Sequence, residues 1–487
     1  MTSPNGTSEF PLRPVKFSRL TRRGILLGLS APRLATAALG LLTVIISLYA
    51  AGSSGLLWTS PLWVGAAALT WVRVAGRPAV EWLPVTAHWL LRVARGQTRY
   101  RRRIAHPRPA GTLALPGDGA PLRQLEDPET GAVMVHDPHA ATLTAILEVT
   151  HPAFVLLDPG EQQRRVESWG RVLSSLCRSP RIARAQVLER TIPDSGTGLD
   201  AWWRERGIDD GSWVARTYAE LIDRAGPAAE RHVTTISLSL DMRAASRAIR
   251  AAGGGITGAG RVLRQDMDAL TAALRAADLR PAPWHTPEQL AVMLRSAYDP
   301  AVAATLERHS DVGRDLAAAG PLAVEETWTT LRSDSAHHAV LRVSEWPRAM
   351  VYPGFLAPVL LSSGVRRAVS IIYDPIRPDA AARDIRRKKT EHISDHAQRT
   401  KIGQIEDAAI SAEYADVLQQ EADLVAGHGI LRYTALIAVT ATTPHALEAA
   451  VSAIQQAAVQ ASLETRRLYG QQAQGFVAAA LPLARGL

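Results

Sequence analysis

The pattern of apolar and polar residues begins with an uncharged, strongly apolar stretch that runs from Leu34 to Val72. A helix needs about 20 apolar residues to cross a bilayer, so this stretch has room for two compressed spans and a turn. Between the spans, the sequence AGSSGLLWTSP supplies the Gly, Ser and Pro residues that are typical of turns. We therefore predict a two-helix transmembrane hairpin over residues 29–75.

Basic residues flank this hairpin on both sides and set its orientation. Because loops rich in Lys and Arg stay in the cytoplasm, both termini are expected on the cytoplasmic side of the inner (plasma) membrane. Residues 1–28 then form a polar cytoplasmic tail. The alternative is a cleaved signal peptide, but such a peptide has a shorter apolar region close to its start. The long polar lead and the second apolar stretch favour a multi-pass membrane protein.

Apolar residues recur at helical spacing just after the hairpin, within residues 76–103, and the segment becomes basic toward its end. Tryptophan prefers the headgroup boundary, and a basic amphipathic helix can lie in that plane. We therefore expect a juxtamembrane helix that rests on the membrane surface. The alternative is a cytoplasmic helix packed on the rest of the protein. The expected membrane-interface residues are Trp82, Trp89, Arg92, Arg95 and Arg99.

The soluble body begins with a segment of different composition. Residues 104–138 are rich in Pro and Gly and are predicted to form a linker. Residues 142–150 and 232–241 alternate apolar with polar side chains, which predicts strands with one buried face and one wet face. Residues 286–321 are predicted to be a helical connector, because they open with the helix-capping sequence TPEQ.

The predicted elements follow a similar order in residues 139–285 and in residues 322–487. In each part a helix leads to a strand, and a later strand leads to a closing amphipathic helix. The two closing helices share the apolar spacing i, i+4, i+7 and i+11, which is common among amphipathic helices. We predict an α+β fold in which two similar sheet-plus-helix units follow the membrane hairpin.

The charge distribution argues against a body that binds nucleic acid. The formal net charge is +9, but residues 1–110 hold 15 Lys and Arg against 2 Asp and Glu, while the remainder holds 40 against 44. The basic excess therefore lies beside the hairpin, where it can meet anionic headgroups and fix the topology. We expect the lipid bilayer as a partner and no direct sequence-specific binding of nucleic acid.

No motif for catalysis, cofactor binding or metal binding stands out in the sequence. The only glycine-rich run, Gly253–Gly260, is not followed by the Lys and hydroxyl residues that complete a phosphate-binding loop. His337 and His338 are adjacent in an expected strand, where neighbouring side chains face opposite ways, so they cannot share a metal. Cys177 is the single cysteine, which excludes an internal disulfide and predicts a buried, inert thiol. We predict no catalytic, cofactor-binding or metal-binding residue, and no enzyme activity.

One further cluster of charge lies in the second half of the chain. Residues 386–389 are four consecutive cations in an expected helix that also carries acidic residues. This pattern favours a solvated helix face, with a partner-binding patch as the alternative.

Two parts of the body resemble the amino-terminal domain of the type IV secretion (conjugation) ATPases. The first is SEWPRAMVYPGFLAPVLLSSGVRRAVSIIYDP with the charged helices behind it, and the second is the ending GHGILRYTALIAVTA and GQQAQGFVAAALPLARGL. The hairpin resembles the two-span small inner-membrane subunit of the same machines, which is fused to the ATPase in some systems. The residues that carry the family pattern are Trp346, Pro347, Tyr352, Pro353, Leu481 and Pro482.

The resemblance implies an inner-membrane component of a conjugation-like translocation machine of actinobacterial type. In that family this domain packs on the inner-membrane complex, and the ATPase core begins just past an ending like the present one. Since no phosphate-binding loop is found, ATP hydrolysis is not carried over. We expect a structural protein that docks a separate secretion ATPase, other inner-membrane subunits and further copies of itself. The alternatives are a membrane-anchored enzyme with a dispersed site and a membrane-tethered DNA-transfer protein.

Overall fold

A computed structural model describes most of the chain. The described residues are 12–17, 30–74, 76–103, 111–151, 154–193, 197–208, 210–225, 230–308, 315–402 and 408–486. Most of the predicted tail and the first part of the predicted linker lie outside these residues.

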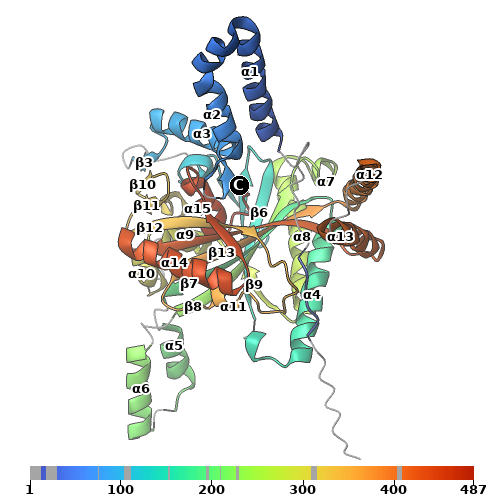
Figure 1. The fold of residues 1–487 in the computed structure, drawn as a ribbon. Helices are drawn as coiled ribbons and strands as arrows, with labels where there is room; N and C mark the ends of the chain where they lie inside the picture. Colours follow the sequence, from blue (N-terminus) through green and yellow to red (C-terminus); the bar gives the residue numbers. More distant parts are fainter. Residues whose placement is uncertain are drawn as a thin grey trace, which may run out of the picture.

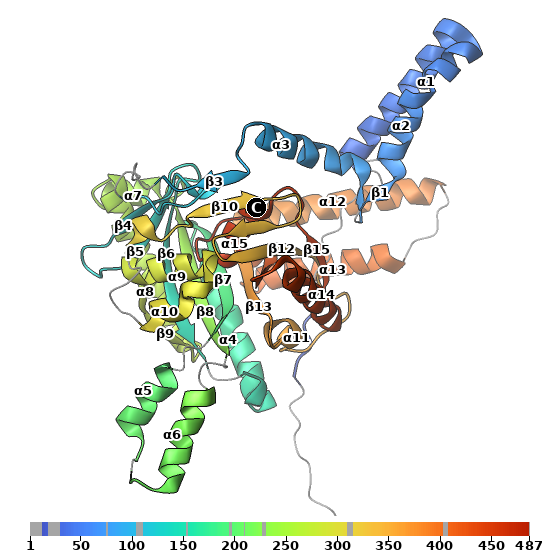
Figure 2. The same ribbon diagram turned by 90° about the vertical axis from the view of Figure 1, so that its left-hand side faces the viewer.

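Two apolar helices, α1 (Ala31–Trp58) and α2 (Ser60–Trp71), project together from the body (Figures 1 and 2). The chain reverses inside α1 at Gly52, whose φ of 61° and ψ of −144° are not helical. Positive φ is accessible to glycine without steric cost, so the turn falls at this residue. We call residues 31–71 the apolar arm.

The two sides of the apolar arm contact each other through small side chains. The hydroxyl oxygens of Thr36 and Thr70 are 2.9 Å apart. A Cβ added at Gly40 would lie 2.9 Å from the Cβ of Ala66, so this close approach requires glycine. Small residues are what allow apolar helices to pack closely where the hydrophobic effect does not drive association.

α1 is the one described helix that is long and apolar enough to cross a membrane, and only 11% of its most apolar window is buried in the protein. α2 has 12 residues and does not meet the same criterion of length. The described structure therefore supports one candidate span. The predicted two-span hairpin is not established by it.

Thirteen strands form the sheet of the body in the described part of the chain. They are β3 (Arg99–Arg101), β4 (Arg123–Glu126), β5 (Val133–Asp137), β6 (Thr142–Thr150), β7 (Ile182–Pro193), β8 (Glu230–Asp241), β9 (Arg280–Trp284), β10 (Ala323–Glu326), β11 (Leu331–Ser333), β12 (Ala336–Glu345), β13 (Arg366–Ile376), β14 (Ile430–Ala441) and β15 (Glu464–Arg467). Their order is β3-β10-β11-β12-β14-β13-β7-β8-β6-β5-β4, with β9 beside β6 and β15 beside β12. A separate pair, β1 (Arg73–Val74) and β2 (Arg77–Pro78), follows the apolar arm.

The helices of the body lie mostly on the two faces of this sheet, except for one pair that projects from an end of the body (Figures 1 and 2). They are α4 (Pro159–Arg178), α5 (Thr197–Arg206), α6 (Trp213–Ala225), α7 (Ser246–Ala251), α8 (Gly255–Ala276), α9 (Pro287–Tyr298), α10 (Ala303–Arg308), α11 (Ala357–Leu360), α12 (Pro378–Ile402), α13 (Ala408–Val425), α14 (Pro444–Gln460) and α15 (Gln472–Ala480). One apolar cluster joins α9 and α15 to strands of both halves. On the other face, α4 and α8 cover the first half and α14 covers the second.

The two halves of the sheet have the same topology. Along the chain, β4-β5-β6-α4-β7-α5-α6-β8-α8-β9 corresponds to β10-β11-β12-α11-β13-α12-α13-β14-α14-β15 when α7, α9, α10 and α15 are set aside. In space, β7-β8-β6-β5-β4 corresponds to β13-β14-β12-β11-β10. The halves meet where β7 and β13 pair in antiparallel fashion. The predicted mixture of helix and sheet is confirmed.

The predicted strands at residues 142–150 and 232–241 are confirmed as β6 and β8, but their polar faces are not wet. Ser237 and Ser239 are buried, because α15 and the C-terminal residues cover this face. The hydroxyl of Ser237 donates to the carbonyl oxygen of Pro482 at 2.8 Å. Buried hydroxyls are tolerated when they are hydrogen-bonded in this way.

The described part of the predicted linker 104–138 belongs to the sheet. It contains β4 and β5, and Leu113 and Leu115 are fully buried in the core. Pro and Gly in this segment mark tight turns between short strands. The composition therefore predicted the turns correctly, but the prediction of a linker was wrong for the described part. The first unit therefore begins before residue 139.

The predicted helix start at Thr286 is confirmed. The Thr286 side chain accepts from the backbone N–H of Gln289, and the Gln289 side chain accepts from the N–H of Thr286, which together form a capping box. This cap fixes the beginning of α9 in the connector between the two halves.

Candidate interaction surfaces

The juxtamembrane helix α3 (Trp82–Ala94) docks on the body through its tryptophans. The Trp82 ring lies 5.3 Å from the Tyr469 ring, and the Trp89 ring lies 5.8 Å from the Trp328 ring. Aromatic pairs at such distances stabilise a contact beyond the area that they bury. The two tryptophans thus contact the body, as the alternative of a packed helix expects, and their place at the membrane interface stays a prediction.

The three arginines predicted at the membrane interface have different environments. Arg92 donates from Nη2 to Oε2 of the buried Glu326 at 2.5 Å, which is a charge-assisted contact that locks α3 in place. Arg99 lies in β3 and pairs with Glu325 at 3.0 Å on the surface. Arg95 is exposed at the end of α3. Only Arg95 and Arg99 are therefore placed at the surface.

The opposite face of α3 carries apolar side chains that the protein leaves exposed. They are Leu83, Leu90 and Leu91. Such a face fits the apolar boundary of a membrane better than water. The periodicity identified the helix, but it did not identify which of its two apolar faces the body covers.

Trp346, one of the family-pattern residues, lies in an aromatic cluster with the N-terminal segment. The Trp346 ring stacks on Phe17 at 5.0 Å and meets Tyr433 edge-on at 5.1 Å. The backbones of Val15 and Val351 exchange hydrogen bonds of 2.7 and 3.0 Å. Residues 12–17 of the predicted tail therefore lie against the body.

The remaining family-pattern residues are dispersed. Pro347 is buried, Pro353 is half-buried, and Tyr352 is 58% exposed. Leu481 and Pro482 are buried in the C-terminal segment, on the face of the sheet that α15 covers. The structure does not bring the six residues together into one site.

The C-terminal segment closes the seam between the two halves. The Gln186 side chain, on β7, donates to Ser370 Oγ of β13 at 2.9 Å and to the carbonyl oxygen of Leu481 at 3.0 Å. Its Oε1 accepts from the N–H of Ala484 at 2.7 Å. All of these contacts are buried, so this amide holds both halves and the C-terminal segment together.

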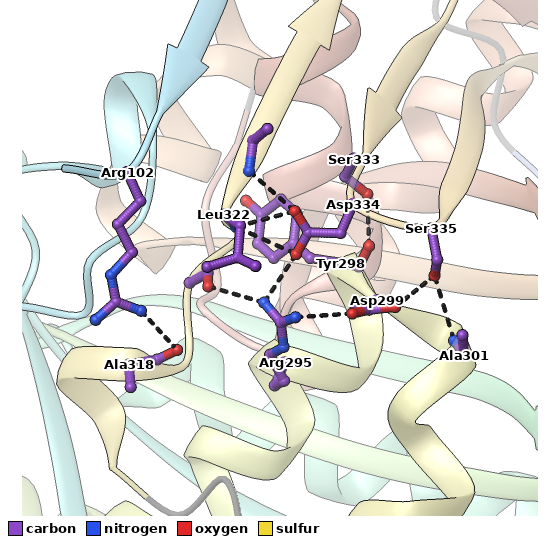
Figure 3. A network of polar contacts seen from close by, with 12 residues as sticks. Arg102, Arg295, Tyr298, Asp299, Ala301, Ala318, Leu322, Ser333, Asp334 and Ser335 are labelled. Atoms are coloured by element: carbon purple, nitrogen blue, oxygen red, sulfur yellow. Dashed lines mark hydrogen bonds and ion pairs between the residues drawn. The ribbon is translucent and has the colours of Figure 1, made fainter. Parts of the chain in front are cut away.

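A second polar network ties the connector to the second half (Figure 3). Arg295 on α9 contacts Asp334 Oδ2 at 2.8 Å and Asp299 Oδ2 at 2.7 Å. Asp334 Oδ1 also accepts from the N–H groups of Leu322 and Ala323, each at 2.9 Å. The carboxylates are compensated by Arg295 and by backbone donors, as is usual for a structural network.

The paired histidines do not form a metal site. His338 is fully buried, with Nε2 2.6 Å from Ser333 Oγ and Nδ1 2.9 Å from Thr440 Oγ1. Burial lowers the pKa of His338 to about 3, so the ring is neutral. No group of three or more His, Cys, Asp or Glu side chains within the described ranges is placed to hold a metal ion.

Cys177 and the glycine run both have structural explanations. Cys177 is buried, as predicted, with Sγ 3.5 Å from the carbonyl oxygen of Ile430. Burial raises the pKa of its thiol, which disfavours the reactive thiolate. Gly253–Gly255 have positive φ and make the turn between α7 and α8. This turn requires glycine, so the glycine run is explained without phosphate binding.

A cleft of about 1570 Å³ lies at the base of the apolar arm, with Arg77 and Trp82 among its lining residues. Its walls come from the N-terminal segment, the start of α3, strands β12, β14 and β15, and helices α12, α13 and α14. Nine Lys and Arg residues line it against four Asp and Glu residues. We call it the basic cleft. Sequence reasoning missed it, because its cations come from segments that are far apart along the chain.

The four consecutive cations at residues 386–389 contribute to one wall of this cleft. Arg387 and Lys388 line it, and both contact Asp384 on the same helix at 3.2 and 3.0 Å. Lys389 instead pairs with Glu421 of α13 at 2.7 Å. The run is thus a solvated helix face in part, and in part the lining of the cleft.

Helices α5 and α6 form a pair that projects from the end of the body opposite the apolar arm (Figures 1 and 2). Trp203 and Tyr218 pack between the two helices, with their rings 4.8 Å apart. Other apolar side chains remain exposed, among them Trp202 and Trp213. Sequence analysis did not single this pair out.

Comparison with known proteins gave one family. A family model described as "Putative type VII ESX secretion system translocon, EccE" matches residues 228–343, about a quarter of the chain. The match runs from β8 to β12 and contains the connector with its Arg295 network. No curated protein matches the chain. The match and α1 together suggest a membrane component of a secretion system; the matched family is of type VII, so the type IV resemblance is not supported.

Proposed function

We propose that this chain is a non-catalytic structural subunit of a type VII-like secretion translocon. The apolar arm anchors it in the membrane, and the body docks other subunits, a separate ATPase and further copies of the chain among them. The observation that carries this proposal is the match of residues 228–343 to a secretion translocon family. The same segment contains the connector that joins the two halves, so the likeness falls on the centre of the body.

Both sides of the apolar arm fit a membrane by length. The helix from Ala31 to the turn at Gly52 spans about 31 Å at 1.5 Å per residue, and the return to Trp71 spans about 28 Å. The hydrocarbon core of a bilayer is about 30 Å thick. We propose that both sides cross it, with both termini in the cytoplasm, as the flanking arginines favour.

A structural role is supported by the buried polar clusters. The carboxylates around Arg295 and the amide of Gln186 are compensated by neighbouring groups. A catalytic site needs a group with unused hydrogen-bonding capacity that faces a cavity. Neither cluster offers one.

Co-purification tests the proposal. The full chain, tagged at its C-terminus, is extracted from membranes in mild detergent, and its companions are identified by mass spectrometry. We expect membrane subunits of a secretion machine and a hexamer-forming ATPase in fixed ratio to the chain. A tagged version of an unrelated two-span membrane protein from the same cells is the control. Recovery of the chain as a lone monomer, without any secretion subunit, would contradict the proposal.

A further inference from the structure

The basic cleft has more positive charge than its own walls neutralise. Its lining carboxylates are largely occupied by cations of the same lining: Glu448 by Arg467 at 2.7 Å, and Asp384 by Lys388 at 3.0 Å. The lining holds nine Lys and Arg against four Asp and Glu. Acids just outside it also contact these cations, since Lys16 pairs with Asp416 at 2.7 Å and Arg387 with Glu391 at 3.6 Å, and a smaller formal excess of positive charge remains. A concave surface lined by one sign of charge concentrates ligands of the opposite sign.

The cleft lies directly at the base of the apolar arm. The N–H of Ala79 donates to the carbonyl oxygen of Val72, the residue after α2, at 2.9 Å. Arg77, two residues before Ala79, lines the cleft. On the facing wall, Arg466 donates to the carbonyl oxygen of Gly76 at 3.3 Å. The rim of the cleft is therefore held by hydrogen bonds within a few residues of the end of α2.

The position of the cleft favours lipid headgroups over an acidic protein segment as its anionic occupant. The polar headgroup layer adds about 5–8 Å to each side of the hydrocarbon core, so a rim at the end of α2 lies in that layer. Trp82, whose indole N–H donates to the carbonyl oxygen of Val74 at 3.0 Å, also lines the cleft. Lipid headgroups reach such a rim without leaving the bilayer, whereas an acidic protein segment must enter beneath it.

We propose that the basic cleft binds the headgroups of anionic phospholipids. The proposal rests on the membrane insertion of the apolar arm that is proposed above. Arginine and lysine side chains on opposite walls bind the phosphate oxygens, and the excess charge selects anionic over zwitterionic lipids. Basic pockets next to membrane helices bind such headgroups by the same chemistry.

The test is calorimetric titration of the full chain, in mild detergent, with short-chain phosphatidylglycerol. The variant Lys388→Gln with Arg432→Gln removes one cation from each of two walls of the cleft. Asp384 keeps its contact with Arg387 in this variant. The matched control, Arg247→Gln with Arg250→Gln, removes two exposed cations of α7, outside the lining of the cleft. We expect saturable binding that weakens about fivefold for each cation removed from the cleft and is unchanged in the control.

Parallel titrations separate the sources of negative charge. Short-chain phosphatidylcholine should give no saturable binding. If inorganic phosphate or polyglutamate binds as tightly as phosphatidylglycerol, or if the control variant loses the same affinity, the proposal is overturned. Carbonate extraction of the membranes distinguishes its failure from that of the proposed function: a chain that stays in the membrane but does not bind phosphatidylglycerol overturns the lipid site alone.

Discussion

At the scale of single residues, the buried charges explain how the connector is held. Arg295 bridges Asp299 on its own helix and Asp334 in the turn between β11 and β12. All three side chains are largely buried, so each carboxylate depends on this guanidinium. Removing one partner from such a group leaves an uncompensated charge in a poorly solvated place.

We predict that Arg295→Leu lowers the free energy of unfolding by about 3 kcal/mol. Chemical denaturation followed by circular dichroism in detergent measures this loss. The control is Arg383→Leu, because Arg383 forms an exposed pair with Asp379 on α12. Exposed pairs contribute little, so the control should change stability by less than about 0.5 kcal/mol. Equal effects of the two substitutions would contradict the role assigned to Arg295.

A second prediction concerns pH. Burial lowers the pKa of His285 from 6.5 to about 4, and its Nε2 has no hydrogen-bond partner. As the pH falls from 6.5 toward 4, the unfolded chain binds a proton at this residue and the folded chain does not. Stability is therefore complete above pH 6.5 and falls by about 1.4 kcal/mol per pH unit in that window. His338 contributes in the same direction.

Replacing the titrating group tests this dependence. In His285→Leu, the slope of unfolding free energy against pH between 6.5 and 4 should be smaller by about 1.4 kcal/mol per unit. The matched variant His445→Leu, at an exposed position just inside α14, should keep the slope of the unaltered protein. If both variants give the same slope, burial of His285 is not the cause.

Sequence reasoning at this scale succeeded where the signal is local. The cap at Thr286 is recognisable because its partner Gln289 is three residues away. One of the two acidic partners of Arg295 is Asp334, 39 positions along the chain, so no spacing rule could pair these two residues. Similarly, the sequence shows Gln186 only as a polar residue in a strand. Its buried contacts depend on the C-terminal segment, which is far away along the chain.

At the scale of elements, α3 illustrates what periodicity leaves open. The helix was predicted from its apolar spacing, but it has two apolar faces. Which face the body covers depends on Trp328 and Tyr469, which lie far along the chain. Positive φ at Gly470 brings the backbone close enough to contact Trp328, since a Cβ at this glycine would lie 2.6 Å from the ring.

We predict that Trp328→Ala releases α3 from the body. This change removes the ring that both Trp82 and Trp89 contact, and each aromatic pair contributes about 0.5–1.5 kcal/mol. Trypsin cleavage after Arg92 and Arg95 should become at least about tenfold faster, as followed by mass spectrometry. The control is Trp202→Ala on α5, at the other end of the molecule. Cleavage that is no faster in Trp328→Ala would contradict the docking.

At the scale of the whole molecule, the two halves share one topology, but their sequences show this only weakly. The shared spacing of the closing helices is visible in the sequence. The spatial order of the strands and the pairing of β7 with β13 are not, because they depend on contacts between distant segments. The segment predicted as a linker was misassigned because its strands β4 and β5 have only four and five residues.

The proposed topology predicts a labelling pattern. In Ser54→Cys, the thiol lies just beyond the turn at Gly52 and should react with a membrane-impermeant maleimide in intact cells. In Arg247→Cys, on the body, reaction should require permeabilised cells. Cys177 is buried and gives little background. Labelling of position 247 in intact cells, or of position 54 only after permeabilisation, would contradict the topology.

The edge of the sheet has a consequence for how the protein is made. β10 would end the sheet with unpaired backbone groups, but Arg99–Arg101 pairs with it as β3. Exposed strand edges invite pairing with other chains. β3 is synthesised well before β10. Each newly made β10 can therefore pair at once with the β3 strand of its own chain. The segment that follows α3 thus also shields this edge of the sheet from pairing with other chains.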